Sequence, residues 1–299
     1  MKILICICTY NRNLQLKKCI ESFKKAFIPT NLEIKFLIID NSINNHSFKL
    51  INILKKKIKF SISYFNEPKR GIVYARNKAL KESKKIKSDF TAFFDDDCVI
   101  DKFWFKNIKK LLNKFPIITG PQIYKKSRTN EENLSIFFEK KYKTKLQTVD
   151  WAATNNVIIK SNILKYSKLK FDFNLNKFSM GEDQLFFKKL NKMGYKIIWS
   201  KDLKVYEEYH KKRSNITEVL QRSYRLGVLG HYIDKQIYGN FIGLILNYFK
   251  SFYFLILGIL KIFKITDNNY LLNLSDNFLR FYGRVIGPII FKKINFYKK

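Results

Sequence analysis

The sequence is poor in cysteine and in the glycine-rich loops that bind phosphate. Its four cysteines are Cys6, Cys8, Cys19 and Cys98, and no further Cys or His pair has the spacing of zinc ligands. We interpret them as small buried apolar residues and predict no disulfide, which is typical of a reducing compartment. The glycine-rich motifs of Rossmann dinucleotide-binding proteins and of P-loop proteins are absent. The sequence therefore lacks the loop with which either class of protein binds phosphate.

Acidic residues are also scarce, with 24 against 58 basic residues and a net charge of +34. A charge of this size attracts nucleic acids, anionic lipids or nucleotides. An AT-rich coding sequence also produces a protein rich in Lys, Asn, Ile and Phe. Compositional drift therefore explains the positive charge as well as a functional role does. Hydrophobic residues make up 46% of the 299 residues, enough for one large domain with an appendage.

The first half of the chain alternates between apolar runs and helical periodicity. The run at residues 3–8 is too short for a signal peptide and is followed by no small-residue cleavage site, so we predict a buried first strand. Further strands are predicted over residues 34–39, 62–65 and 90–94, and helices over residues 14–23, 48–57 and 72–83. This alternation predicts an α/β fold with a mainly parallel, Rossmann-like sheet flanked by helices.

Polar residues follow three of these strands, in the sets Thr9–Arg12, Asp40–Ser42 and Asp95–Asp97. Ligands of open α/β sheets bind beyond the carboxyl ends of the strands, so we expect the sets to converge. Three adjacent carboxylates repel one another, and a divalent cation relieves that cost; Mg²⁺ takes one or two carboxylates together with phosphate oxygens and water. On a strand, the first and third carboxylates would face one way and Asp96 the other. A solvated acidic turn is the alternative.

The second half is less regular. A strand is predicted over residues 151–160, and a helix begins at Gly181, where Glu182 and Asp183 complement the positive end of the helix. Another strand is predicted over residues 196–199. The carboxylate pair is well separated in sequence from the Asp triplet.

The composition changes near residue 240. Residues 241–263 are apolar and long enough to span a membrane, but Asn247, Lys250, Ser251 and Lys261 form one polar stripe. Lys250 near the middle would cost roughly 2.5–3.5 kcal/mol in a spanning helix. The stripe therefore favours a helix lying in the membrane interface, and the alternative is a helix packed on the protein or on a dimer partner.

We accordingly divide the chain into an α/β domain at residues 1–230 and a helical, basic and aromatic region at residues 231–299. The second region is expected to lie on an anionic membrane surface, at its cytoplasmic face.

Five short motifs occur in a fixed order along the chain. They are residues 5–12 (ICICTYNR), 38–42 (IIDNS), 71–77 (GIVYARN), 94–97 (FDDD) and 181–183 (GED). In this order and spacing the chain resembles the family 2 glycosyltransferases, which have the GT-A fold, over about residues 1–230. Each motif is weak by itself, but five in sequence are hard to reach by chance.

The resemblance implies roles for individual residues. Contacts to the donor nucleotide are implied for Thr9, Tyr10, Arg12, Asp40, Arg76, Asn77, Asp95 and Asp96. Asp97, with Asp95, would bind Mg²⁺ or Mn²⁺; Asp183 would be the general base, with Glu182 as its support or substitute. The acceptor side would include Trp151, Asn155 and Asn156, although Ala153 stands where relatives often have glycine. Trp151 either stacks on a sugar or is a half-buried strand residue.

The reaction implied is an inverting single displacement from a nucleotide-sugar to a hydroxyl of a glycan or lipid-linked acceptor, in cell-surface glycan or polysaccharide synthesis. Glu208, Arg213, Arg222 and Arg225 resemble a downstream pattern of the family, although Arg at helical spacing is usually a solvated face. His210 is interpreted as a surface histidine rather than a metal ligand. One rival is a basic nucleic-acid-binding protein, which lacks a recognisable module here. The other is an inactive glycosyltransferase-like subunit at a membrane.

Overall fold

The computed structural model describes residues 1–124, 144–207, 215–262 and 270–296. Glu208, His210 and Arg213 therefore lie outside the described residues. The strands are β1 Lys2–Thr9, β2 Glu33–Asp40, β3 Ser61–Asn66, β4 Phe90–Asp95, β5 Cys98–Ile100, β6 Ile117–Thr119, β7 Gln122–Tyr124, β8 Leu146–Val149, β9 Asn156–Lys160, β10 Ile197–Ser200 and β11 Val205–Glu207. The helices are α1 Asn13–Lys25, α2 Phe48–Lys57, α3 Ile72–Ser83, α4 Trp104–Lys109, α5 Ser161–Tyr166, α6 Glu182–Lys192, α7 Ile216–Tyr238, α8 Asn240–Ile262 and α9 Tyr270–Ile290, with a short 3₁₀ helix at Phe173–Phe178.

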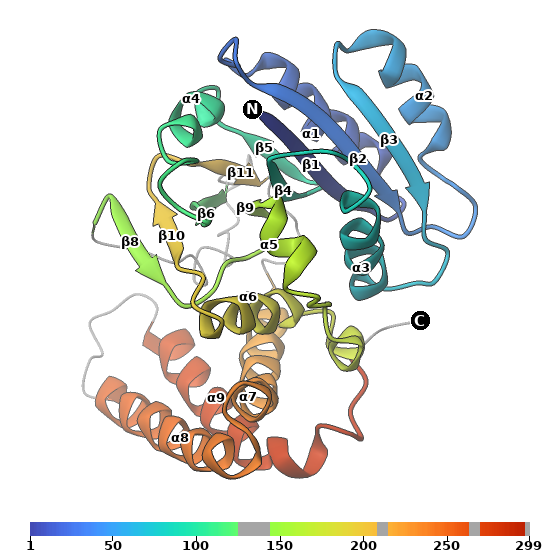
Figure 1. The fold of residues 1–299 in the computed structure, drawn as a ribbon. Coiled ribbons are helices and arrows are strands. Elements are labelled where there is room, and N and C mark those ends of the chain that lie inside the picture. The colour runs from blue at the N-terminus through green and yellow to red at the C-terminus, as the bar shows by residue number, and fades with distance from the viewer. Residues whose placement is uncertain (125–143, 208–214, 263–269, 297–299) are drawn as a thin grey trace. The chain divides into compact units, whose positions relative to one another are not determined.

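An eight-stranded sheet forms the centre of the N-terminal part, in the order β3-β2-β1-β4-β9-β6-β10-β8 (Figure 1). The first four strands are parallel, as the alternating pattern predicts. Strand β9 runs antiparallel to both β4 and β6, and β8 runs antiparallel to β10. The sheet is therefore mixed, because its second half is not built from repeated βαβ units. A second sheet has the order β5-β11-β7.

Helices cover both faces of the large sheet. Alternate residues of β1 divide between two cores: Ile3, Ile5 and Ile7 pack with apolar side chains of α1 and α2, while Leu4 and Cys6 pack with those of α3, α5 and α6. A strand covered on both sides must be apolar at every position, which is why the sequence shows a continuous run rather than alternation.

The predicted cysteine environment is confirmed. All four cysteines are free, and only Cys8 is not fully buried. Burial raises the pKa of Cys6, Cys19 and Cys98 well above the usual range, so these thiols are unreactive.

Helices 48–57 and 72–83 have the predicted bounds. The prediction of a strand over residues 151–160 is wrong in its first half, since β9 begins only at Asn156. Residues 151–153 have no regular structure and residues 154–155 form a turn, at which the Asn156 amide donates to the Ala153 carbonyl at 3.5 Å.

The described chain forms two compact units. Among the described residues, the first comprises 1–124, 144–176 and 182–207, and the second 177–181, 215–262 and 270–296. Within the second unit α7, α8 and α9 pack on one another. The predicted boundary at residue 230 falls inside α7, whereas the second unit takes in the whole of that helix.

Candidate functional site

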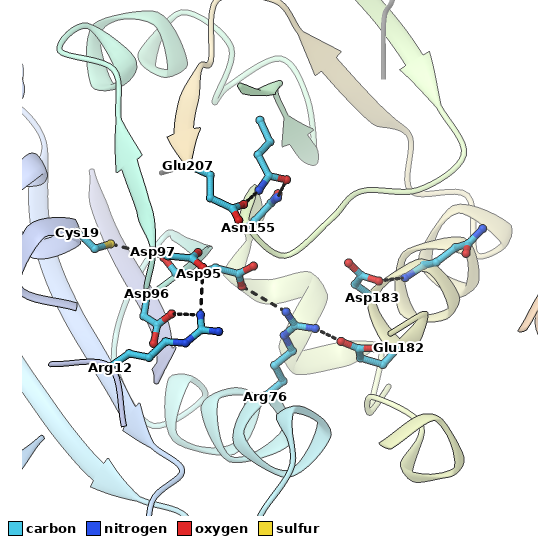
Figure 2. Close-up of polar contacts among 12 residues, drawn as sticks. Arg12, Cys19, Arg76, Asp95, Asp96, Asp97, Asn155, Glu182, Asp183 and Glu207 are labelled. Atoms are coloured by element: carbon cyan, nitrogen blue, oxygen red, sulfur yellow. Dashed lines mark hydrogen bonds and ion pairs between the residues drawn. The ribbon is translucent and has the colours of Figure 1, made fainter. Parts of the chain in front are cut away.

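The Asp triplet lies where β4 ends. Asp95 is the last residue of the strand, and Asp96 and Asp97 form a two-residue turn before β5. Thr9, at the end of the neighbouring β1, donates from Oγ1 to Asp96 Oδ2 at 2.7 Å. The Arg12 guanidinium donates from Nη1 to Asp96 Oδ1 at 3.2 Å and to Asp97 Oδ2 at 3.0 Å. The polar ends of two adjacent parallel strands therefore meet, as expected (Figure 2).

The turn changes the expected arrangement within the triplet. Strand alternation does not apply to Asp96 and Asp97, because the strand ends before them. Asp96 is the most constrained of the three, since Thr9 and Arg12 bind it and only 4% of its surface is exposed. Burial raises the pKa of Asp96 to about 6, against the lowering effect of Arg12. The Asp95 side chain, by contrast, is 41% exposed and accessible to a ligand.

Arg76 on α3 joins the triplet to the start of α6. Its Nη2 donates to Asp95 Oδ1 at 3.3 Å, and its Nη1 donates to Glu182 Oε1 (Figure 2). Arg76 and Glu182 are both buried, and 106 residues of sequence separate them. One guanidinium thus bridges two acidic motifs that the sequence analysis could assign only to separate roles.

The charges around Arg76 have opposing effects. Burial lowers the pKa of Arg76, but Glu182 and Asp95 raise it by more, so the guanidinium is a permanent cation. Burial also raises the pKa of Glu182 to about 7, against the attraction of Arg76. Glu182 Oε2 is buried without a hydrogen-bond partner among the described residues. Asp183 is less buried, and its Oδ1 accepts from the Gln184 amide at 2.7 Å.

The raised pKa of Glu182 predicts a pH-dependent stability. The folded state holds this proton more tightly than the unfolded chain, whose carboxyl has the ordinary value of 4.5. The contribution is complete below pH 4.5 and is lost as the pH rises through about 7, so stability falls with pH across this window. We expect Glu182→Gln, which cannot ionise but keeps an oxygen that accepts from Arg76, to resemble the protonated wild type. Its urea unfolding free energy should therefore vary less between pH 5 and pH 7.5 than that of the wild type.

The matched control is Glu33→Gln, because Glu33 is an exposed carboxylate whose pKa is lowered by its hydrogen bond to Lys35. It titrates below the window and should leave the slope between pH 5 and pH 7.5 unchanged. A Glu182→Gln protein with the full wild-type slope would show that Glu182 does not titrate there.

Asp40 holds the loop that follows β2. Its Oδ1 accepts from the Ser42 amide at 3.0 Å, and its Oδ2 accepts from the Ser47 amide at 2.7 Å and from the Tyr64 hydroxyl at 2.8 Å. The residue has no exposed surface. Its position beside Thr9 in the β1–β2 register puts this loop next to the triplet, so the geometry gives Asp40 a positioning role.

Asn41, for which no role was predicted, organises the loop between β3 and α3. Its Nδ2 donates to the carbonyls of Glu67 and Lys69 at 2.7 and 2.8 Å, and its Oδ1 accepts from the Gly71 amide at 2.8 Å. Gly71 has φ +134°, and a Cβ there would lie 2.0 Å from Asn176 Oδ1, so only glycine fits at the start of α3. The position of Asn41 directly after Asp40, at the end of a strand, was the one sequence signal for this role.

Tyr10 and Asn77 are the two remaining residues for which the resemblance implies a contact with the donor nucleotide. Tyr10 is 40% exposed, and the Arg70 guanidinium lies 5.2 Å from the centre of its ring. Asn77 exchanges two 2.9 Å hydrogen bonds with the backbone of Phe171, which uses both ends of its amide. The geometry thus presents Tyr10 for contact with a ligand and gives Asn77 a structural partner.

The residues expected on the acceptor side also separate. Asn156 is 1% exposed, and its amide accepts from Trp104 Nε1 at 3.1 Å and donates to the Leu203 carbonyl at 2.6 Å, so it is part of the core. Trp151 is half-buried in the irregular segment before β9. Asn155 donates to Gln122 Oε1, and Gln122 donates in turn to Glu207 Oε2.

Sequence reasoning missed Gln122 and Glu207. Glu207 is 1% exposed at the end of β11, where it pairs in register with Cys98, the residue after Asp97. Figure 2 shows Glu207 beside Asn155. A lone acid that ends a strand gives a weak signal, because the pairing of β11 with β5 cannot be read from the sequence.

The donor set fits Mg²⁺ or Mn²⁺. Asp95 offers an accessible carboxylate and Asp97 a buried one, and their charge is partly offset by Arg76 and Arg12 respectively. Within the described ranges, no group of three or more His, Cys, Asp or Glu side chains could hold a metal ion alone. Two carboxylates are what Mg²⁺ typically takes from a protein, with phosphate oxygens and water completing its shell.

Known proteins share this fold. The succinoglycan biosynthesis protein ExoM of Rhizobium meliloti (strain 1021) is 24% identical over 232 residues, which cover 74% of this chain and 71% of ExoM. The S. aureus TarS 1-349 structure in complex with UDP-GlcNAc has a TM-score of 0.53 at 15% identity, covering 99% of this chain and 93% of TarS 1-349. The Pyrobaculum calidifontis mannosyltransferase PcManGT, in complex with GDP-Man and Mn²⁺, has a TM-score of 0.60 at 12% identity, covering 96% and 87%. These structures show the GT-A fold.

A model of the family described as glycosyl transferase family 2 matches residues 4–190. The match takes in every motif that builds the site, from Thr9 at the end of β1, through the triplet after β4, to Glu182 and Asp183 at the start of α6. It covers more than half of the sequence, and the chain therefore belongs to glycosyl transferase family 2.

Proposed function

We propose that this glycosyltransferase moves a sugar from a nucleotide-diphospho-sugar to a hydroxyl of a glycan or lipid-linked acceptor, with inversion and without a covalent intermediate. The bridge from Asp95 through Arg76 to Glu182 carries the proposal. A single displacement needs a site for the leaving nucleotide and a base near the acceptor hydroxyl. Through this bridge, the Arg76 guanidinium holds the accessible end of β4 close to the acidic start of α6.

Asp95 and Asp97 are the residues that would hold a divalent cation, which would supply positive charge to the leaving diphosphate. Three neighbouring residues, Thr9, Arg12 and Arg76, hold the Asp triplet in place. Thr9 and Arg12 fix the turn by binding Asp96. Arg76 orients Asp95 from the opposite side.

The base and ribose contacts are assigned to exposed groups near the strand ends. Tyr10 offers an exposed ring stacked by a cation, which suits a nucleotide base. Asp40 is assigned an indirect role, because its three hydrogen bonds shape the loop after β2.

Asp183 is assigned as the general base. Its Oδ1 is held by the Gln184 amide, and Oδ2 can accept a proton from an acceptor hydroxyl. Glu182 is buried against Arg76 and is assigned to orient that guanidinium. The adjacent carboxylates Asp183 and Glu182 are thus assigned different roles, because Asp183 is accessible and Glu182 is buried.

We further propose a role in cell-surface polysaccharide synthesis at the cytoplasmic face of a membrane. The similarity to a succinoglycan biosynthesis protein supports the first part. Helix α8 is long and apolar enough to cross a membrane, and the net charge of +34 favours anionic lipids, which supports the second.

A thermal-shift screen of nucleoside diphosphates with Mn²⁺ tests the donor site. A nucleotide that binds the folded state should raise the melting temperature by several degrees when it is present at about 100 times its Kd. Asp95→Asn should reduce this shift. Asp202→Asn should not, although the Asp202 side chain is equally exposed at 41%.

Two outcomes would favour the rival functions. Tight, salt-sensitive DNA binding with no response to any nucleotide and no nucleotide-sugar hydrolysis would indicate a nucleic-acid-binding protein. Nucleotide binding without turnover on any acceptor preparation would indicate an inactive subunit.

A further inference from the structure

Helix α8 turns its polar face inward. Its buried residues are Gly243, Asn247, Ser251 and Gly258, which are all small or polar. The exposed positions from residue 241 to residue 262 are all apolar: Phe241, Ile242, Leu244, Ile245, Tyr248, Phe249, Phe252, Tyr253, Ile256, Ile259, Leu260 and Ile262. A helix on the surface of a water-soluble protein has the opposite arrangement.

Helix α9 repeats the inversion. Its buried residues are Asn277, Gly283, Arg284 and Gly287. Its exposed residues are Leu271, Tyr282 and Ile289. At about 100° per residue these three side chains fall on one face of the helix, opposite the buried set. Two successive helices therefore present apolar faces outward.

The inward polar groups meet and satisfy one another. Arg284 on α9 donates from Nη1 to Asp234 Oδ2 on α7 at 2.9 Å and to Asn247 Oδ1 on α8 at 3.0 Å. Lys250 donates from Nζ to Asp234 Oδ1 at 2.6 Å. Lys250, whose side chain is 39% exposed, thus has an anionic partner, which lowers the cost of placing its ammonium at a membrane.

Glycines bring these helix backbones close together. A Cβ on Gly227 of α7 would lie 2.9 Å from Gly283 Cα of α9, and one on Gly243 of α8 would lie 2.6 Å from Lys235 Cα of α7. Small residues at the contacts, joined by polar side chains between helices, are the packing mode of helices in membranes, where apolar burial gives no drive to association.

We propose that α8 and α9 are immersed in the hydrocarbon of a lipid bilayer, held together by the Asp234–Arg284–Lys250 cluster, rather than laid on its surface. The apolar arc of α8 covers about 180° of the helix at 100° per residue, wider than the roughly 100° stripe that packs against a protein partner. Its 23 residues extend about 34 Å, which matches a hydrocarbon core of about 30 Å. The inference deepens the proposed membrane location and is independent of the proposed reaction.

Flotation of the full-length protein with neutral phosphatidylcholine vesicles tests the proposal. We expect the protein to float at about 1 M NaCl, where a Debye length of about 3 Å removes surface attraction. Phe249→Asp should lower vesicle partitioning by at least about tenfold, because it adds a charge to the lipid face. Tyr166→Asp in the first unit is the matched control, since Tyr166 is 69% exposed and Phe249 72%.

A second measurement fixes the depth. Phe249→Trp should show fluorescence quenching by lipids brominated in mid-chain, beyond that of the wild type, and Tyr166→Trp should not. Binding that needs anionic vesicles and is reversed by salt would overturn the proposal in favour of a surface helix. A protein that is soluble without detergent and dimeric, with Phe249→Asp monomeric, would overturn it in favour of a second copy as the partner. Nucleotide-sugar hydrolysis by the same preparations separates a failure here from a failure of the proposed reaction.

Discussion

Asp97→Ala is expected to abolish metal-stimulated sugar transfer, with turnover lower by at least about a thousandfold, which corresponds to roughly 4 kcal/mol of barrier. The substitution removes one of the two carboxylates that would hold the cation and leaves the charge of the leaving diphosphate unbalanced. Turnover measured with and without Mn²⁺ or Mg²⁺ checks it, because metal stimulation should disappear together with activity.

The fold should survive this change. Arg12 keeps its contact with Asp96 at 3.2 Å, and a half-exposed pair such as Arg12–Asp97 contributes only about 0–1 kcal/mol. Asp202→Asn, at an exposed carboxylate paired with Lys145, should retain wild-type turnover. Turnover and metal dependence that are unchanged in Asp97→Ala would remove Asp97 from the cation site.

Asp183→Asn is expected to retain donor binding and to lose transfer, by about a hundredfold to ten-thousandfold. The amide keeps an oxygen that can accept from the Gln184 backbone, so the first turn of α6 stays formed. It cannot take a proton from the acceptor hydroxyl. Calorimetry with the nucleoside diphosphate and a transfer assay on the same preparation separate binding from turnover.

The same variant tests whether Asp183 only stabilises the helix terminus. That role would cost about 0.3–1 kcal/mol of stability and leave turnover nearly intact. A comparison with Glu182→Gln is informative, because Glu182 contacts Arg76 and not solvent. If Glu182→Gln loses transfer and Asp183→Asn keeps it, the assignment of the base is reversed.

Much of the first unit follows from local pattern. Helices α2 and α3 have the predicted bounds, and the four parallel strands lie where apolar runs predict them. Burial on both faces of a sheet requires a run that is apolar at every position, and this signature is local. The strand at β9 was predicted too long, and its first residue, Asn156, is held by partners distant in sequence, Trp104 and Leu203.

The sequence indicates which motifs to expect in the candidate site, but it does not indicate the contacts between their side chains. Charge crowding in Asp95–Asp97 pointed to a cation, but the two-residue turn that buries Asp96 is a property of how β4 connects to β5. The hydrogen bond from Arg76 to Glu182 joins residues 106 positions apart. Periodicity reports which residues share a face, and it carries no information on which distant side chains meet.

The C-terminal helices show the same division most clearly. The apolar length of residues 241–263 and the stripe containing Asn247 and Lys250 are evident from the sequence, and they raise the question of a membrane. Which way the stripe faces depends on Asp234 and Arg284, which come from the helices on either side of α8 in the chain. A helix periodicity defines two faces and is symmetric between them, so the apolar face of α8 could be assigned outward only once its polar partners were found inside.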